Sequence, residues 1–304
     1  MLSRIAENIY WIGRYMERAD DTARLLSTHL YGLLQAGSPN DRLLPEELLA
    51  VLGRDQSSLS SAPINLQTVA WHYIADPDTD SSVLNCLHLA RENARRSQQQ
   101  LAVEAWESLN TAASTLEPLI DQRGSVGELL RVVPQLTQSF LGVVHTALQR
   151  DETWTFLQLG MLLERADMTL RVLLLGAKSV ADRDPLDPLA VHMRAISLRA
   201  CAAPDVLRTS GPEQLTDRSV RDVLLREPTV PRSVWFCLDG VSRLTGGEPA
   251  AMAIALRDEV AVPEDEADGN VDADWPDRYR DLLARSRTLH SAIVATYMRP
   301  ARVA

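Results

Sequence analysis

The feature that most constrains the fold is a short charged segment that occurs twice in the 304 residues. It reads GRYMERADDTARLL from Gly13 to Leu26 and GMLLERADMTLRVL from Gly160 to Leu173, an offset of 147 residues. A second echo, SVLNCL at 82–87 and SVWFCL at 233–238, follows in the same order at an offset of 151 residues. The sequence therefore indicates a tandem duplication, with internal repeats at 1–150 and 151–304 of a single domain. The period is too long for a solenoid.

Helical periodicity dominates the chain. Apolar residues recur at three-and-four spacing from Ile5 to Leu30, as in an amphipathic helix. Further helices are predicted over 45–53, 63–75, 81–119, 126–149, 151–179, 186–203, 216–226, 232–245, 248–260 and 277–298, and no segment alternates as a strand does. The predicted fold is all-α, a helical bundle built from two tandem, pseudo-symmetric repeats.

The composition indicates which partners the protein can bind and where in the cell it is found. A formal net charge of -10 and a pI near 5.1 argue against binding to nucleic acid or to anionic membranes, which depends on a basic surface. No apolar run has the length of a signal peptide core or a membrane span. The three cysteines are widely separated and lie among apolar neighbours, as reduced thiols of a cytosolic core do. We therefore expect a cytoplasmic protein with neither nucleic acid nor membrane as partner.

The charges of the first motif copy share one helix face. Arg14, Glu17, Arg18, Asp21 and Arg24 lie within about 120° of one another, opposite the apolar stripe. Taken alone, this pattern is typical of a solvated face.

The second motif copy is surrounded by apolar residues, which predicts a buried helix. Its charges, Glu164, Arg165, Asp167 and Arg171, then need partners, because an unpaired buried charge is costly. Asp167 and Arg171 can pair at i,i+4, whereas the adjacent Glu164 and Arg165 need partners from other helices. We expect the two motif helices to meet near a pseudo-twofold axis, with Glu17 and Arg18 reaching the charges of the second copy.

A third charged cluster follows the first Ser-Val-x-x-Cys-Leu element and contains Glu92, Asn93 and Arg95. Its counterpart in the second repeat, Ser242-Arg243-Leu244, lacks this charge pattern. The cluster is interpreted either as a structural ion-pair network or as part of an asymmetric ligand pocket.

Sequence signatures of common catalytic centres are missing. The chain contains no Glu-x-x-His pair of the di-iron bundles, no HExxH, Cys-x-x-Cys, GxGxxG or GxSxG, and no phosphate-binding GxxxxGK loop. The histidines are scattered. The sequence therefore predicts neither a metal site nor a cofactor.

Three segments carry a resemblance to a known family. ENIYWIGRYMERADDTARLL, RENAR with WESLN downstream, and LGMLLERADMTLRVL resemble the bacterial alpha-E family, a helical domain of unknown function. The resemblance implies that the motif positions are Glu17, Arg18, Glu92, Asn93, Arg95, Glu164 and Arg165. It also implies a circularly permuted ATP-grasp protein as partner, and a transglutaminase-like protease as a second candidate.

Three functions follow as alternatives. The first is a noncatalytic partner that shapes or carries the substrate of an ATP-grasp amide or peptide ligase, with arginines holding carboxylates. The second is an enzyme in which a buried glutamate of raised pKa acts as general base and arginines stabilise an anionic intermediate. The third is a scaffold whose motif charges only pair with each other.

Overall fold

The computed structural model describes residues 1–36, 43–53, 64–181, 183–203, 215–262 and 275–298. These residues form helices joined by short connections, without any β-strand in the described ranges. The predicted all-α class is therefore confirmed.

The helices fall into two successive sets. The first set is α1 Ser3–Ala36, α2 Leu43–Val51, α3 Leu66–Ala75, α4 Val83–Arg96, α5 Val103–Asp121 and α6 Val126–Thr146. The second is α7 Glu152–Val180, α8 Pro188–Ala200, α10 Asp217–Arg221, α11 Val234–Leu244, α12 Gly247–Ala261 and α13 Trp275–Tyr297. A π-helical turn, Asp222–Arg226, directly continues α10.

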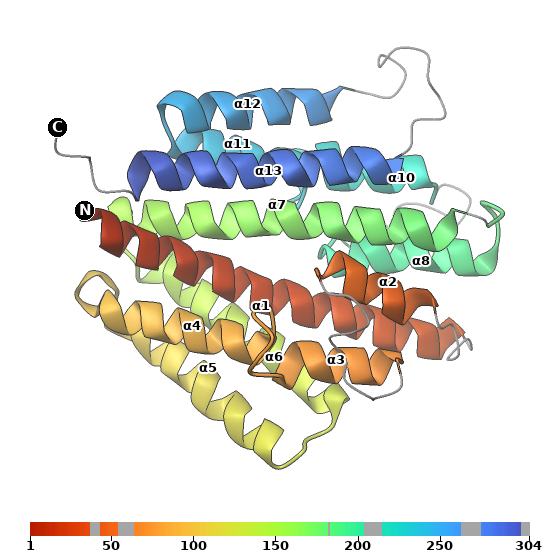
Figure 1. Cartoon of the computed structure of the whole chain (residues 1–304), viewed down its shortest axis with the longest axis horizontal. Coiled ribbons are helices and arrows are strands. Elements are labelled where there is room, and N and C mark those ends of the chain that lie inside the picture. Colours follow the sequence, from red (N-terminus) through yellow and green to blue (C-terminus); the bar gives the residue numbers. More distant parts are fainter. Residues whose placement is uncertain (37–42, 54–63, 182, 204–214, 263–274, 299–304) are drawn as a thin grey trace.

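The two longest helices, α1 and α7, cross at the centre of the molecule and run in the same direction (Figure 1). Their first residues lie close together, since the amino group of Met1 binds the Glu152 carboxylate at 2.5 Å. Helices α4 and α6 pack on α1 with α5 outside them, and α11 and α13 pack on α7 with α12 outside them. The motif helices thus form the inner layer of the bundle.

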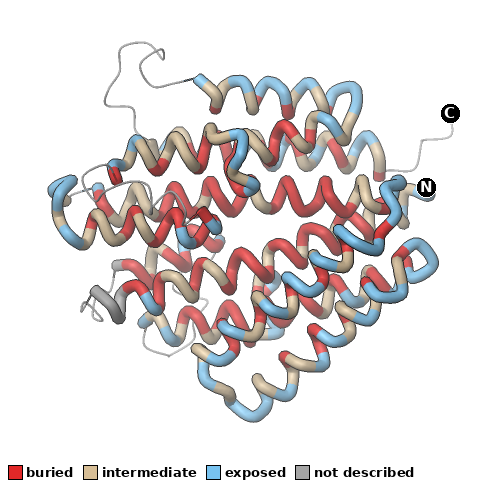
Figure 2. Tube along the Cα trace, turned by 180° about the vertical axis from the view of Figure 1, so that it is seen from behind, coloured by how far each residue is buried: buried red, intermediate tan, exposed pale blue. Residues whose placement is uncertain are grey.

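Burial follows this arrangement. Buried residues concentrate along the central helices and exposed ones along the outer helices (Figure 2). Helix α7 is buried on nearly all sides, as predicted. The solvated face that the first motif copy would suggest if taken alone is not found, because Glu17 is 0% exposed and Asp21 is 3% exposed. That face is covered by α7 and by the segment that precedes α11, which the helical pattern of α1 alone does not reveal.

The echoed Ser-Val-x-x-Cys-Leu elements are helix starts. Ser82 caps α4 by accepting the backbone N–H of Asn85, and Ser233 caps α11 in the same way from Phe236. Such side-chain caps satisfy an otherwise unpaired amide of the first turn. The cysteine that follows each cap, Cys86 or Cys237, is fully buried.

The single helix expected over 81–119 is wrong. The chain leaves α4 at Ser97, makes a short 3₁₀ turn at Gln98–Gln100 and begins α5 at Val103. Leu101 in this connection is only 8% exposed and joins the core, which lets α5 fold back along α4. The periodic apolar positions continue across the turn, so the sequence pattern does not mark it.

Among the helices of the described ranges, none combines the length and the apolar character that a bilayer span requires.

Candidate functional site

The two motif helices touch backbone to backbone at two glycines. A Cβ added to Gly13 would collide with the carbonyl oxygen of Leu157, and one added to Gly160 would collide with that of Tyr10. Glycine is required at both positions because a side chain would push the helices apart. The close approach brings the charged residues of the next helical turn within reach of each other.

Those charges form two reciprocal bidentate ion pairs. Arg165 of α7 donates to both carboxylate oxygens of Glu17 at 2.9 Å. Arg18 of α1 donates to both oxygens of Glu164 at 2.6 and 2.9 Å. Each motif therefore supplies the glutamate for the arginine of the other, and the expected contact between the motifs is confirmed.

Both glutamates are buried and ionised. Glu17 is 0% and Glu164 is 4% exposed. Burial alone would raise the pKa of each carboxyl group. Arg165 and Arg232 outweigh it and lower the pKa of Glu17, and Arg14 and Arg18 lower the pKa of Glu164 to about 2. Fork-shaped guanidinium groups suit this task because they satisfy both carboxylate oxygens at once.

Two aspartates extend the pairing by one turn. Thr137 of α6 donates its hydroxyl to Asp20 at 2.7 Å, and Ser286 of α13 donates to Asp167 at 2.5 Å. Asp20 also accepts from Arg24 at 2.7 Å. The aspartates thus tie the central helices to the outer layer.

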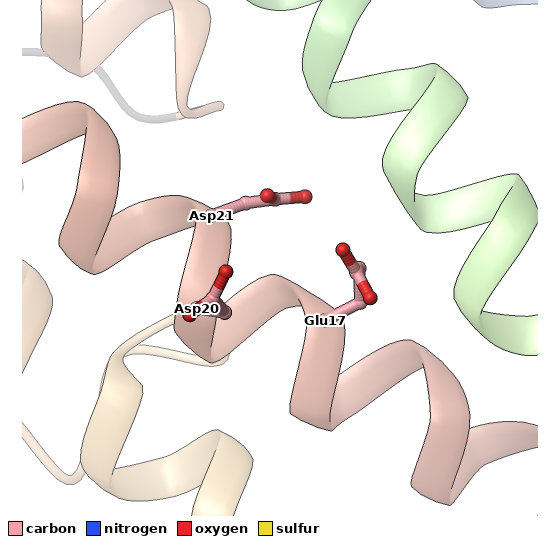
Figure 3. Close-up of side chains that lie close together, drawn as sticks. All are labelled: Glu17, Asp20 and Asp21. Carbon is pink, nitrogen blue, oxygen red and sulfur yellow. The ribbon is translucent and has the colours of Figure 1, made fainter. Parts of the chain in front are cut away.

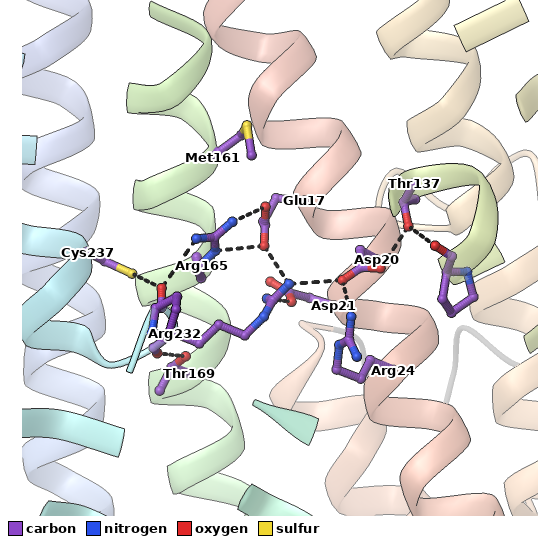
Figure 4. A network of polar contacts seen from close by, with 12 residues as sticks. Glu17, Asp20, Asp21, Arg24, Thr137, Met161, Arg165, Thr169, Arg232 and Cys237 are labelled. Atoms are coloured by element: carbon purple, nitrogen blue, oxygen red, sulfur yellow. Dashed lines mark hydrogen bonds and ion pairs between the residues drawn. The ribbon is translucent and has the colours of Figure 1, made fainter. Parts of the chain in front are cut away.

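One face of the α1–α7 crossing is closed by Arg232, which lies just before α11. Its guanidinium binds Glu17 and Asp20, each at 2.9 Å, and Asp21 (Figure 4). Asp21 keeps one oxygen without a partner. Burial raises its pKa well above the usual range, and Arg232 offsets this only in part.

The three carboxylates of this face also form the acidic trio of Figure 3. Oxygens of Glu17, Asp20 and Asp21 lie within 4.8 Å of one another, a spacing that could suit a cation. Arg232 contacts all three, and Arg165 binds Glu17 as well. Arginine side chains therefore already neutralise the trio.

The opposite face of the crossing is open. Arg14 binds Glu164 at 2.5 Å and Asp167 at 3.0 Å, and is 6% exposed. Beside it lies a cavity of about 290 Å³, lined by Arg14, Arg18, Arg171, Arg287, Glu164 and Asp167 among others. Burial lowers the pKa of Arg171.

The expected i,i+4 pair between Asp167 and Arg171 is not the arrangement found. Asp167 is held by Arg14 and Ser286, and Arg171 donates to the backbone carbonyl of Val51. Burial raises the pKa of Asp167, although Arg14 opposes this effect.

The third cluster lies away from the crossing, on the exposed face of α4. Glu92 accepts from Arg95 at 2.8 and 2.9 Å and from Arg96 at 2.9 Å, all within one helix. Asn93 is half-buried beside them. Of the two interpretations, the contacts fit a surface ion-pair network. Glu92, Asn93 and Arg95 do not line the cavity described above.

Sequence reasoning missed two central residues, Asp20 and Arg232. The alignment of the two copies does pair Asp20 with Asp167, so the repeat itself pointed to Asp20 rather than to its neighbour Asp21. Arg232 stands immediately before the second Ser-Val-x-x-Cys-Leu element, where the first has Ser81. That difference could be read from the sequence, but its consequence could not.

Comparison with known proteins identifies the family. A model described as a predicted alpha-helical domain with a conserved ER motif, Alpha-E, matches residues 1–298. An uncharacterised protein of Mycobacterium bovis is 24% identical over 258 residues, which cover 78% of this chain and 29% of the relative. An uncharacterised protein of Mycobacterium tuberculosis is 23% identical with the same coverage, so the chain spans less than a third of these relatives. No solved structure matches. The sequence contains the dipeptide Glu-Arg at Glu17-Arg18 and at Glu164-Arg165, and the chain belongs to the Alpha-E family.

Proposed function

We propose that this chain is a cytoplasmic, noncatalytic partner of an ATP-grasp-type amide or peptide ligase, and that it shapes or carries the substrate. The observation that carries the proposal is the use of the motif charges. Both motif glutamates are buried in bidentate pairs with arginines of the other copy. The motif therefore serves as a clasp between α1 and α7, and leaves recognition to other groups.

If the protein were an enzyme, its general base would have to be a carboxylate other than Glu17 or Glu164. A general base works best when its pKa lies near the operating pH. The arginines lower the pKa of Glu17 and hold that of Glu164 at about 2, so both are weak bases. Asp21 and Asp167 have raised pKa values, but Arg232 contacts the first and Arg14 the second. These features favour a noncatalytic role.

The length of the relatives supports a role in partnership. In the mycobacterial proteins, the matched region makes up 29% of the chain. A domain of this kind is thus joined there to a much larger segment, which supports a role for this chain alongside a second protein unit. A transglutaminase-like protease is the second partner that the family resemblance suggests.

We further propose that the chain arose by duplication of a helical unit. Within the described residues, both halves follow the same order: a long motif helix, two shorter helices, a serine-capped helix with a buried cysteine, and two further helices. Equivalent residues also make equivalent contacts, as the hydroxyls of Thr137 and Ser286 do with Asp20 and Asp167. This relation supports the pseudo-symmetry that the repeats predict.

The experiment is a reconstitution with the ATP-grasp protein encoded in the same genome. The two purified proteins are mixed and examined by size-exclusion chromatography, and ATP hydrolysis by the ligase is measured with and without this chain. We expect co-elution and a change in the ligase rate. Two proteins that elute separately, with an unchanged ligase rate, would refute the partnership.

A surface variant locates the docking face. Glu92→Arg reverses a charge of the exposed α4 cluster and should leave the fold intact, because surface ion pairs contribute little stability. Arg243→Glu, at an exposed position of α11, is the matched control. Loss of co-elution by the first variant alone would place the ligase on α4, and wild-type behaviour of both variants would exclude that face.

A further inference from the structure

The two faces of the α1–α7 crossing are built from equivalent positions but are filled differently. On the closed face, Arg232 reaches between Glu17, Asp20 and Asp21. On the open face, the position equivalent to Arg232 is Ser81, and the position equivalent to Asp21 is Met168. Both Ser81 and Met168 line the cavity of about 290 Å³. The cavity therefore lies where the closed face has an arginine side chain.

The charges of the two faces do not balance in the same way. The closed face sets three carboxylates against the three guanidinium groups of Arg24, Arg165 and Arg232. The open face sets only Glu164 and Asp167 against the four arginines that line the cavity. Two positive charges are therefore in excess on the open face.

The excess resides on Arg171 and Arg287. Arg14 and Arg18 are held by the two carboxylates. Arg171 is half-buried and donates to a backbone carbonyl, and it makes no ion pair with any residue that the structure describes. Arg287 lies exposed at the rim, likewise without a carboxylate partner in the described part of the chain. A partly buried guanidinium group is stabilised by a counter-charge, and among the described residues no carboxylate lies within ion-pair distance of Arg171 or Arg287.

We propose that this cavity binds a small dianion, a dicarboxylate or a phosphate monoester, through Arg171 and Arg287. Guanidinium groups bind both kinds of oxyanion in the same bidentate geometry. The volume of about 290 Å³ is at the lower end of ligand pockets, which suits a compact acid. The inference stands on the cavity alone, so it and the ligase partnership can fail independently.

The test is isothermal titration calorimetry of the full chain at constant ionic strength. The probes are inorganic phosphate, succinate and, as a monoanion, acetate. We expect one site for phosphate or succinate, with acetate binding about 10-fold more weakly because it lacks the second charge. Whichever dianion binds more tightly identifies the chemistry. Absence of measurable binding by either dianion, or equal affinity for acetate, would overturn the proposal.

Two variants assign binding to the cavity. Arg287→Gln removes an exposed charge and should weaken dianion binding about 10-fold with the thermal melt unchanged. Ser81→Arg combined with Met168→Asp rebuilds the closed face in the open one and should abolish binding. Arg243→Gln, which is exposed on α11 and does not line the cavity, is the control. Wild-type affinity in Arg287→Gln would refute the assignment, even if the double variant fails to fold.

Discussion

Because α1 and α7 approach closely at Gly13 and Gly160, we predict that alanine at either position destabilises the protein. In an isolated helix, Gly→Ala is stabilising by about 1 kcal/mol. Here the Cβ added by Gly13→Ala would meet the backbone of Leu157 and lie 3.1 Å from the backbone nitrogen of Met161, against an ordinary contact of 3.4 Å or more. Backbone cannot rotate away as a side chain can, so α1 and α7 must separate by about 1 Å.

That separation affects the ion pairs one turn away. The pairs between the ER motifs have donor-to-acceptor distances of 2.6 to 2.9 Å, and a shift of this size moves them out of hydrogen-bond range. Overpacking a core costs about 1–3 kcal/mol, and disrupting a buried pair about 3–5 kcal/mol. With partial relaxation and the helix-propensity gain, we expect Gly13→Ala to lower the free energy of unfolding by about 3 kcal/mol.

Urea denaturation followed by tryptophan fluorescence and by far-UV circular dichroism measures the loss. The matched control is Gly142→Ala at an exposed position of α6. An added Cβ there has no neighbour within 4 Å, so the substitution should raise the free energy of unfolding by about 0.5–1 kcal/mol. The double variant of Gly13 and Gly160 should lose about 1–3 kcal/mol less than the sum of the two single losses, because both open the same contact. A Gly13→Ala protein within about 0.5 kcal/mol of wild type, or fully additive losses, would refute the reasoning.

Three further predictions concern the charges and thiols of the core. Glu17→Gln should lower the free energy of unfolding in urea by about 3–5 kcal/mol, because two arginines lose their carboxylate. Asp21→Asn should lower it by less than half as much, since burial already raises the pKa of Asp21. Equal losses in the two variants would contradict this order. Because the folded pKa of Glu164 is about 2 and its ordinary value is 4.5, its contribution of about 3 kcal/mol is complete above pH 4.5 and is lost as the pH falls toward 2. Thermal melts across that range should show a smaller pH-dependent loss in Glu164→Gln than in wild type. The three buried thiols, whose pKa burial raises to about 12, should react with a disulfide reagent at pH 8 only at the rate of unfolding, and rapid labelling of the native protein would disprove their burial.

The contact between the motifs could be predicted from the sequence because neighbouring charges cannot pair with each other. Glu164 and Arg165 are adjacent on a helix that apolar residues surround, so their partners had to come from another helix. The first copy, with the complementary charges, was the obvious source. The same logic gave the wrong answer for Asp167, because an i,i+4 neighbour is available in sequence but Arg14 is closer to that carboxylate in space.

The cavity could not be predicted because it depends on where one side chain points. Arg232 belongs to the segment before α11, and its reach to Asp20 and Asp21 depends on the path of that segment. Sequence patterns likewise cannot decide which polar face is covered. The charged stripe of α1 is buried, while the similar cluster around Glu92 on α4 faces solvent.

The adjacency of Glu and Arg in each motif explains why the clasp can be reciprocal. In a twofold-symmetric contact, if the glutamate of one copy binds the arginine of the other copy, then the arginine of the first copy binds the glutamate of the second. Each copy must therefore carry both charges. Placing them side by side prevents pairing within the helix and reserves both for the other copy. A duplicated unit that meets itself in this way is symmetric as long as both copies stay the same. The two copies differ at many positions in this chain. Arg232 against Ser81 and Asp21 against Met168 close one face and leave a cavity on the other, and Arg14, whose counterpart is Met161, adds positive charge beside that cavity. The glutamates and arginines of the clasp can thus remain structural while the differences between the copies create a binding site.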